Sequence, residues 1–137
     1  MAKRGKRVKP VLTAEYILLV TPHVNRRTGA KVTLIALRTV TEFTNFRYEL
    51  VVQPTLDGRT LTLLIQGLRA PELTLPAMGP AEFRHERTDF DGKYEIVVSK
   101  HNKIFDTYTV RVSASEVKVD SIPENRFSEI VTRIEDW

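Results

Sequence analysis

The chain of 137 residues contains no cysteine. This absence excludes disulfide bonds, thiolate catalysis, iron–sulfur clusters and cysteine-based zinc sites, so stability has to come from packing. No apolar run approaches the roughly 20 residues that a membrane-spanning helix needs. The stretch 11–22 is interrupted by Glu15 and Tyr16 and lacks a small-residue cleavage site, so it does not fit a signal peptide. We therefore expect a cytoplasmic protein without a transmembrane segment.

Familiar catalytic motifs are also missing. The sequence has no GxSxG, GxxxxGK[ST] or GxGxxG segment, which excludes the standard sites for acyl transfer, phosphoryl transfer and dinucleotide binding. The histidines His23, His85 and His101 are widely separated and form no HxH or HExxH pair that could fix a metal ion. No catalytic residue, metal or cofactor is predicted.

Positive charge is concentrated at the start of the chain. The first nine residues contain no acid and five basic side chains: Lys3, Arg4, Lys6, Arg7 and Lys9. Removing these five from the 21 Lys and Arg leaves 16, against 17 Asp and Glu in the whole chain. We therefore predict a flexible basic arm at residues 1–10, attached to one nearly neutral domain at 11–137.

Apolar and polar residues alternate with a period of two through residues 16–119, which is typical of half-buried strands. Residues 46–53 alternate cleanly, and Asp57-Gly58, a strong hairpin signal, separates them from 59–67. Turn residues recur between the other alternating segments. The pattern predicts a mainly β fold, with either two antiparallel sheets packed face to face or a small barrel. Of these we choose an antiparallel two-sheet β-sandwich of seven or eight strands.

The C-terminal segment has a different period. Five apolar residues follow the spacing of an amphipathic helix: Phe127, Ile130, Val131, Ile134 and Trp137. Ser121 and Glu124 have the spacing of a capping box, and Pro123 suits a first helical turn. These features predict a short α-helix at 122–136.

Two surfaces are candidates for binding. The proline-rich connection 67–80 carries apolar residues on irregular backbone, where they either close the fold or contact a partner: Leu68, Leu73, Leu75 and Met78. The leading hypothesis is therefore a non-catalytic β-sandwich binding or assembly module, with a protein partner or self-association through this connection or a sheet edge.

The second hypothesis is association with nucleic acid. The basic side chains between residues 3 and 9 could neutralise phosphates, and Arg26 and Arg27 in a polar turn could extend that surface. A solubilising tail explains the same residues without any ligand.

A third hypothesis is an enzyme with an unrecognised pocket, centred on the polar segment 85–92. His85, Glu86, Asp89 and Asp91 lie within seven residues, and the two aspartates have a spacing that suits a hard cation. Gly92 comes too early for a calcium loop, and turn chemistry alone explains Asp91-Gly92. We therefore predict no metal site here.

Overall fold

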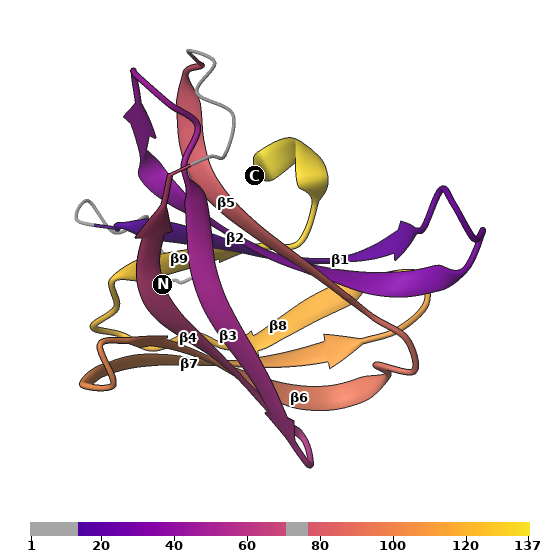
Figure 1. Cartoon of the computed structure of the whole chain (residues 1–137). Coiled ribbons are helices and arrows are strands. Elements are labelled where there is room, and N and C mark those ends of the chain that lie inside the picture. The colour runs from indigo at the N-terminus through magenta and orange to yellow at the C-terminus, as the bar shows by residue number, and fades with distance from the viewer. Residues whose placement is uncertain (1–13, 71–76) are drawn as a thin grey trace, which may run out of the picture.

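The computed structural model describes residues 14–70 and 77–137. Nine strands and one short 3-10 helix account for the regular structure of these residues. The strands are β1 (Tyr16–Val24), β2 (Lys31–Phe43), β3 (Glu49–Asp57), β4 (Thr60–Arg69), β5 (Gly79–Arg87), β6 (Gly92–Lys100), β7 (Ile104–Val112), β8 (Val117–Ser121) and β9 (Ser128–Val131). They form a single sheet in the order β8-β7-β6-β4-β3-β5-β2-β1-β9, which curls into a half-barrel (Figure 1). The prediction of a mainly β fold is confirmed.

Local hairpins follow the turn residues in the sequence. Strands β3 and β4 pair antiparallel from Glu49–Arg69 to Asp57–Thr60, so the hairpin predicted from Asp57-Gly58 is confirmed. Gly58 adopts a φ of +60° in that turn, a conformation that glycine reaches without steric cost. Strands β1 and β2, β6 and β7, and β7 and β8 also pair antiparallel.

The prediction of an antiparallel two-sheet sandwich of seven or eight strands is wrong. One mixed sheet connects all nine strands, and three of its pairings are parallel: β1 with β9, β3 with β5, and β4 with β6. Parallel neighbours are joined through long connections, and such pairings leave no turn signal in the sequence. The period-two alternation therefore predicted that these segments are strands, but it could not predict the order of the strands in the sheet.

The concave side of the sheet holds the main hydrophobic core. Buried side chains from opposite ends of the strand order meet there, including Leu18 of β1, Leu63 of β4 and Tyr108 of β7. A smaller cluster on the convex side consists of Leu19, Leu34 and Ala36, with Val131 and Trp137 packed against them. The curl thus buries one face of every central strand against other strands of the same sheet.

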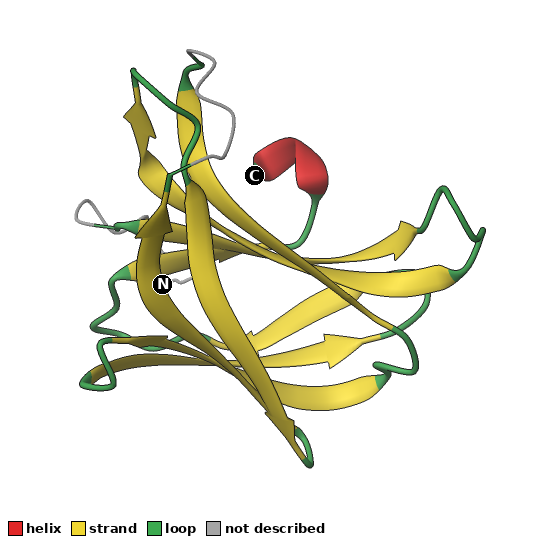
Figure 2. Ribbon diagram, viewed as in Figure 1, coloured by secondary structure: helices red, strands yellow, loops and turns green. Residues whose placement is uncertain are grey.

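The predicted α-helix at 122–136 is also wrong. Residues 128–131 form β9 beside β1, and the only helical turn in the described chain is the 3-10 segment Ile134–Asp136, shown in red in Figure 2. Tertiary partners take the backbone groups that a helix would use: Phe127 donates its N–H to Asp106 Oδ2 (3.0 Å) and accepts a hydrogen bond from the N–H of Glu15 (2.7 Å).

The described residues contain no helix long and apolar enough to cross a membrane. The predicted basic arm at 1–10 lies outside the described residues.

Candidate binding groove

Strands β3 and β5 meet at one corner of the sheet and then separate (Figure 1). They run parallel, and within the described residues the only pairing between them joins Glu49 and Glu82. Beyond that point β3 keeps β4 on its other side, and β5 keeps β2. Both strands therefore present a backbone edge toward the space between them.

Two irregularities lie next to this corner. The β3–β4 register shifts between Val51 and Val52, where Gln66 is the extra residue on β4 and Gly67 has a φ of +144°. A bulge of this kind increases local twist and bends the strand. The bend therefore lies in the β3–β4 ladder, two to three residues beyond the Glu49–Glu82 pair.

The second irregularity separates the pairs Arg38–Glu82 and Glu42–Pro80 of β2 and β5. Here the side chain of the buried Thr39 makes hydrogen bonds in place of the interrupted backbone pairing. Its hydroxyl accepts a hydrogen bond from the N–H of Ala81 (3.0 Å) and donates one to the carbonyl of Thr41 (2.8 Å). The backbone polar groups at the bend thus keep their partners although the strands change register.

The space between the two strands is an open groove of about 520 Å³. Its lining comes from β3, the end of β4, and β5: Glu49, Leu50, Val51, Val52, Arg69, Glu82, Phe83 and Arg84. Leu50 and Val52 are buried members of the main core, and Phe83 packs against the same core. The groove therefore has an apolar floor.

The rim is charged but balanced. Glu49 and Arg69 form an ion pair at one end, with Arg69 Nε 3.0 Å from Glu49 Oε1. Glu82 lies between two arginines, 3.5 Å from Arg47 Nη2 and 3.6 Å from Arg84 Nε. These exposed pairs contribute little to stability. Because the charges offset one another, the rim favours neither an anionic nor a cationic ligand.

Such a groove suits an extended peptide. Unpaired strand edges offer N–H donors and C=O acceptors, which a further strand satisfies along its whole length. Alternate side chains of that strand would point at the apolar floor, because side chains alternate between faces with a period of two. The groove supplies main-chain hydrogen bonding and an apolar contact together.

His85 lies behind Phe83 on the concave side of β5. The two rings stack with centroids 6.1 Å apart, and His85 Nε2 is 3.1 Å from Nη1 of Arg87. Burial lowers the pKa of His85, and the nearby Arg87 guanidinium lowers it further. A neutral imidazole that accepts a hydrogen bond from Arg87 follows from this arrangement.

The structure separates the polar cluster of residues 85–91. Glu86 points to the convex side, opposite His85, where it accepts a hydrogen bond from Asn25 Nδ2 (2.7 Å) and lies 3.7 Å from His23 Nε2. Asp89 and Asp91 line a separate small pocket of about 150 Å³. No three His, Cys, Asp or Glu side chains gather into a metal-binding group anywhere in the described ranges.

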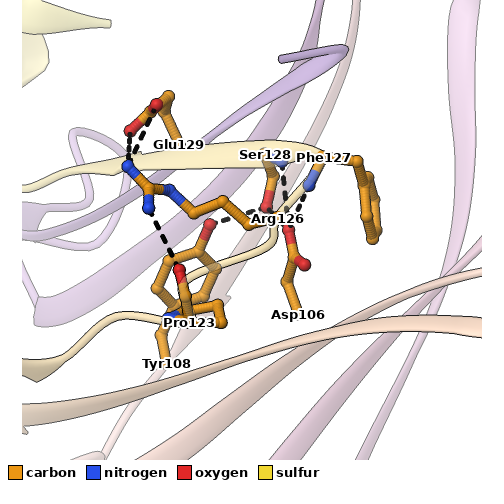
Figure 3. A network of polar contacts seen from close by, with 7 residues as sticks. All are labelled: Asp106, Tyr108, Pro123, Arg126, Phe127, Ser128 and Glu129. Atoms are coloured by element: carbon orange, nitrogen blue, oxygen red, sulfur yellow. Dashed lines mark hydrogen bonds and ion pairs between the residues drawn. The ribbon is translucent and has the colours of Figure 1, made fainter. Parts of the chain in front are cut away.

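A buried polar network joins the two ends of the curled sheet (Figure 3). Asp106 of β7 accepts hydrogen bonds at Oδ2 from the backbone N–H groups of Phe127 and Ser128, both at 3.0 Å, and from the Ser128 hydroxyl. Ser128 Oγ also lies 2.6 Å from the Tyr108 hydroxyl. These contacts connect β7 with β9, although the two strands are seven places apart in the strand order of the sheet.

This network resembles a reactive serine beside an acid, yet its environment does not suit catalysis. Asp106, Tyr108 and Ser128 are all fully buried, so a substrate cannot reach the hydroxyl. Burial raises the pKa of Tyr108, and the phenol stays protonated as a hydrogen-bonding group. The network closes the fold.

Sequence reasoning missed this network, although a signal existed. Asp106 shares the period-two face of Tyr108, Val110 and Val112, and all three of those residues are buried. A carboxyl group on an otherwise apolar face has to find buried donors.

The sequence-predicted partner residues are only partly described. Leu68 on β4 is 47% exposed and Met78 before β5 is 66% exposed, whereas Leu73 and Leu75 lie outside the described residues. Neither Leu68 nor Met78 lines the groove. Both are exposed apolar side chains outside the groove, Leu68 near the end of β4 and Met78 just before β5.

Of the predicted phosphate contacts, Arg26 and Arg27 are exposed in the β1–β2 turn. Asn25 Oδ1 stabilises that turn by accepting hydrogen bonds from the backbone N–H groups of Arg27 (2.9 Å) and Thr28 (3.1 Å). Lys3, Arg4, Lys6, Arg7 and Lys9 lie outside the described residues.

The chain matches no family model, and comparisons with curated proteins and with solved structures found no similar chain.

Proposed function

We propose that this protein is a non-catalytic binding module that captures an extended segment of a protein partner in the groove between β3 and β5. One observation supports the proposal above the others: two parallel strands face each other across an open groove and pair at Glu49–Glu82 alone within the described chain. Strand addition gives affinity through the main chain and selectivity through alternate side chains.

The chemistry of the groove defines the partner segment. The apolar floor, formed by Leu50, Val52 and Phe83, favours apolar residues at alternate positions of the captured strand. The balanced rim imposes no net charge on it. We therefore infer a neutral, extended segment with alternating apolar side chains.

A random peptide library displayed on phage and selected on the full chain tests this proposal. Selected peptides should alternate apolar residues and bind the wild-type protein. In a Val51→Arg variant, the long side chain obstructs the groove, and affinity should fall at least about tenfold, equivalent to about 1.4 kcal/mol. Val24→Arg is the matched control, because Val24 is exposed at the end of β1 and does not line the groove.

Failure to select any peptide would contradict strand capture. Equal binding of the selected peptides to Val51→Arg and to wild type would place the binding surface elsewhere.

A second proposal is association with nucleic acid through the basic N-terminal residues. The exposed positions of Arg26 and Arg27 support it, because neither residue forms an ion pair within the described part of the chain. Replacing the five lysines and arginines of residues 3–9 by glutamine should weaken binding to a single-stranded oligonucleotide and flatten its dependence on salt. Unchanged affinity would contradict this proposal.

A further inference from the structure

Strands β7, β6, β4 and β3 are adjacent in the sheet (Figure 1). On their convex side the register places two neighbouring rows without a charged side chain. The first row consists of Thr55, Thr62, Val97 and Thr107. The second consists of Gln53, Leu64, Ser99 and Phe105, of which Ser99 is buried beneath its neighbours. We call these eight residues the neutral face. Their neighbours along each strand, such as Leu63 and Val98, point into the core on the other side.

The neutral face has the composition of an interface centre. Phe105 is 54% exposed, and Leu64 and Val97 are only half-buried. Thr55 and Thr107 are exposed and can exchange hydrogen bonds with water or with another surface. Charged residues make up 28% of the chain, so eight adjacent uncharged positions distinguish this face. Depletion of charge with retention of aromatic and aliphatic groups characterises the centre of protein interfaces.

Charged side chains border the neutral face, with a different sign at each end. Asp57 and Glu95 belong to the next row at one end. His101 and Lys103 lie in the β6–β7 turn at the other end. All four are exposed, and no ion pair involves Glu95 or Lys103 in the described ranges. Lys93, two residues before Glu95 on the same face, adds a positive charge beyond the acidic row. The border is therefore acidic in its nearest row at one end and carries the basic Lys103 at the other.

We propose that the neutral face binds a second copy of this chain face to face, about a two-fold axis that runs along the rows. This rotation keeps each strand over the same strand of the second copy and exchanges the two rows. Thr107 then lies opposite Phe105 of the second copy, and Thr62 lies opposite Leu64. Small side chains thus meet large ones, as interdigitated packing between sheets requires.

The same rotation brings opposite charges together at the border. Because it reverses the direction of the strands, Glu95 is carried over the β6–β7 turn of the second copy, which contains His101 and Lys103. A two-fold contact is isologous, so each charge contact occurs twice. This complementarity selects a second copy as the occupant of the face.

Sedimentation velocity of the full chain over a concentration series from micromolar to millimolar tests the proposal. Wild type should show a monomer–dimer equilibrium. Thr62→Lys places a charge at the centre of the face and should raise the dimer dissociation constant at least about tenfold. Thr41→Lys, at an exposed threonine on β2 outside the face, should leave the constant unchanged.

A charge reversal tests the orientation. Glu95→Lys and Lys103→Glu should each weaken the dimer, and the double variant should regain part of the lost affinity. Circular dichroism of each variant checks that the fold is retained. A wild-type monomer throughout the series, or a dimer that tolerates Thr62→Lys, would overturn the proposal. Selected peptides should still bind Thr62→Lys, so this result is independent of strand capture in the groove.

Discussion

Asp106 is the residue whose removal should cost the fold most among its polar groups. Its Oδ2 accepts three hydrogen bonds, from the backbone N–H groups of Phe127 and Ser128 and from the Ser128 hydroxyl. In Asp106→Ala all three donors are left without this acceptor in a site with no solvent exposure. A buried unsatisfied donor costs about 1–3 kcal/mol, so a total loss of about 3–5 kcal/mol is expected after partial relaxation.

Urea denaturation measures this loss as a lower free energy of unfolding. The expected loss is a large part of the roughly 5–15 kcal/mol that stabilises a typical domain. Asp120→Ala is the matched control: Asp120 pairs with Arg111 at the surface (2.7 Å), and its loss should cost less than about 1 kcal/mol. A cost below about 1 kcal/mol for Asp106→Ala would refute the role assigned to the network.

The pH dependence of stability gives an independent check. Burial raises the pKa of Asp106 above its ordinary value of 3.8, while the hydrogen bonds from Ser128 and Phe127 partly oppose this shift. The folded state therefore holds the proton more tightly than the unfolded state. The contribution of Asp106 is greatest below pH 3.8 and is lost as the pH rises through the folded pKa. Relative to Asp106→Asn, wild type should lose stability over that range, and a pH-independent difference would contradict the assignment.

Two further substitutions test other parts of the fold. Thr39→Val keeps the side-chain shape but leaves the N–H of Ala81 without an acceptor at the β2–β5 bend. The free energy of unfolding, measured by urea titration, should fall by about 1–3 kcal/mol. The exposed control Thr41→Val should have little effect in the same titration. Trp137→Ala removes the indole that packs against the Leu19 cluster and donates a hydrogen bond to the carbonyl of Ile17 (3.0 Å). The free energy of unfolding should fall by about 2 kcal/mol, which thermal unfolding measures as a lower melting temperature. An unchanged melting temperature would show that the C-terminal turn contributes nothing to stability.

The strands were largely predictable, because each half-buried strand records its two faces in the sequence. Leu61, Leu63 and Ile65 alternate with polar or half-exposed neighbours, and the structure buries all three on the concave side. The turn at Asp57-Gly58 was predictable for a local reason, since only nearby residues determine it.

The strand order was not predictable in the same way. The pairing of β4 with β6 and of β1 with β9 joins segments that are distant in sequence, and no short-range pattern encodes them. The helix prediction for the C-terminal segment was wrong because its apolar residues pack in two different hydrophobic clusters. Phe127 and Ile130 pack against the main core, whereas Val131 and Trp137 pack on the convex side.

The candidate groove was invisible to sequence reasoning for a geometric reason. It exists because β3 and β5 separate after Glu49–Glu82, next to a bulge at Gln66 and Gly67. Neither the bulge nor the parallel contact is marked by a characteristic residue pattern in the sequence. Leu68 and Met78 are exposed, and their role in binding stays a prediction.

Backbone amide hydrogen exchange, followed with and without a peptide selected on the full chain, tests strand capture most directly. Without peptide, amides of β3 and β5 that face the groove should exchange faster than those of β6, which has a neighbour on each side. Added peptide should slow exchange at residues 50–56 and 83–87 and leave β6 unchanged. Protection confined to other strands, or no protection at a saturating peptide concentration, would contradict binding in the β3–β5 groove.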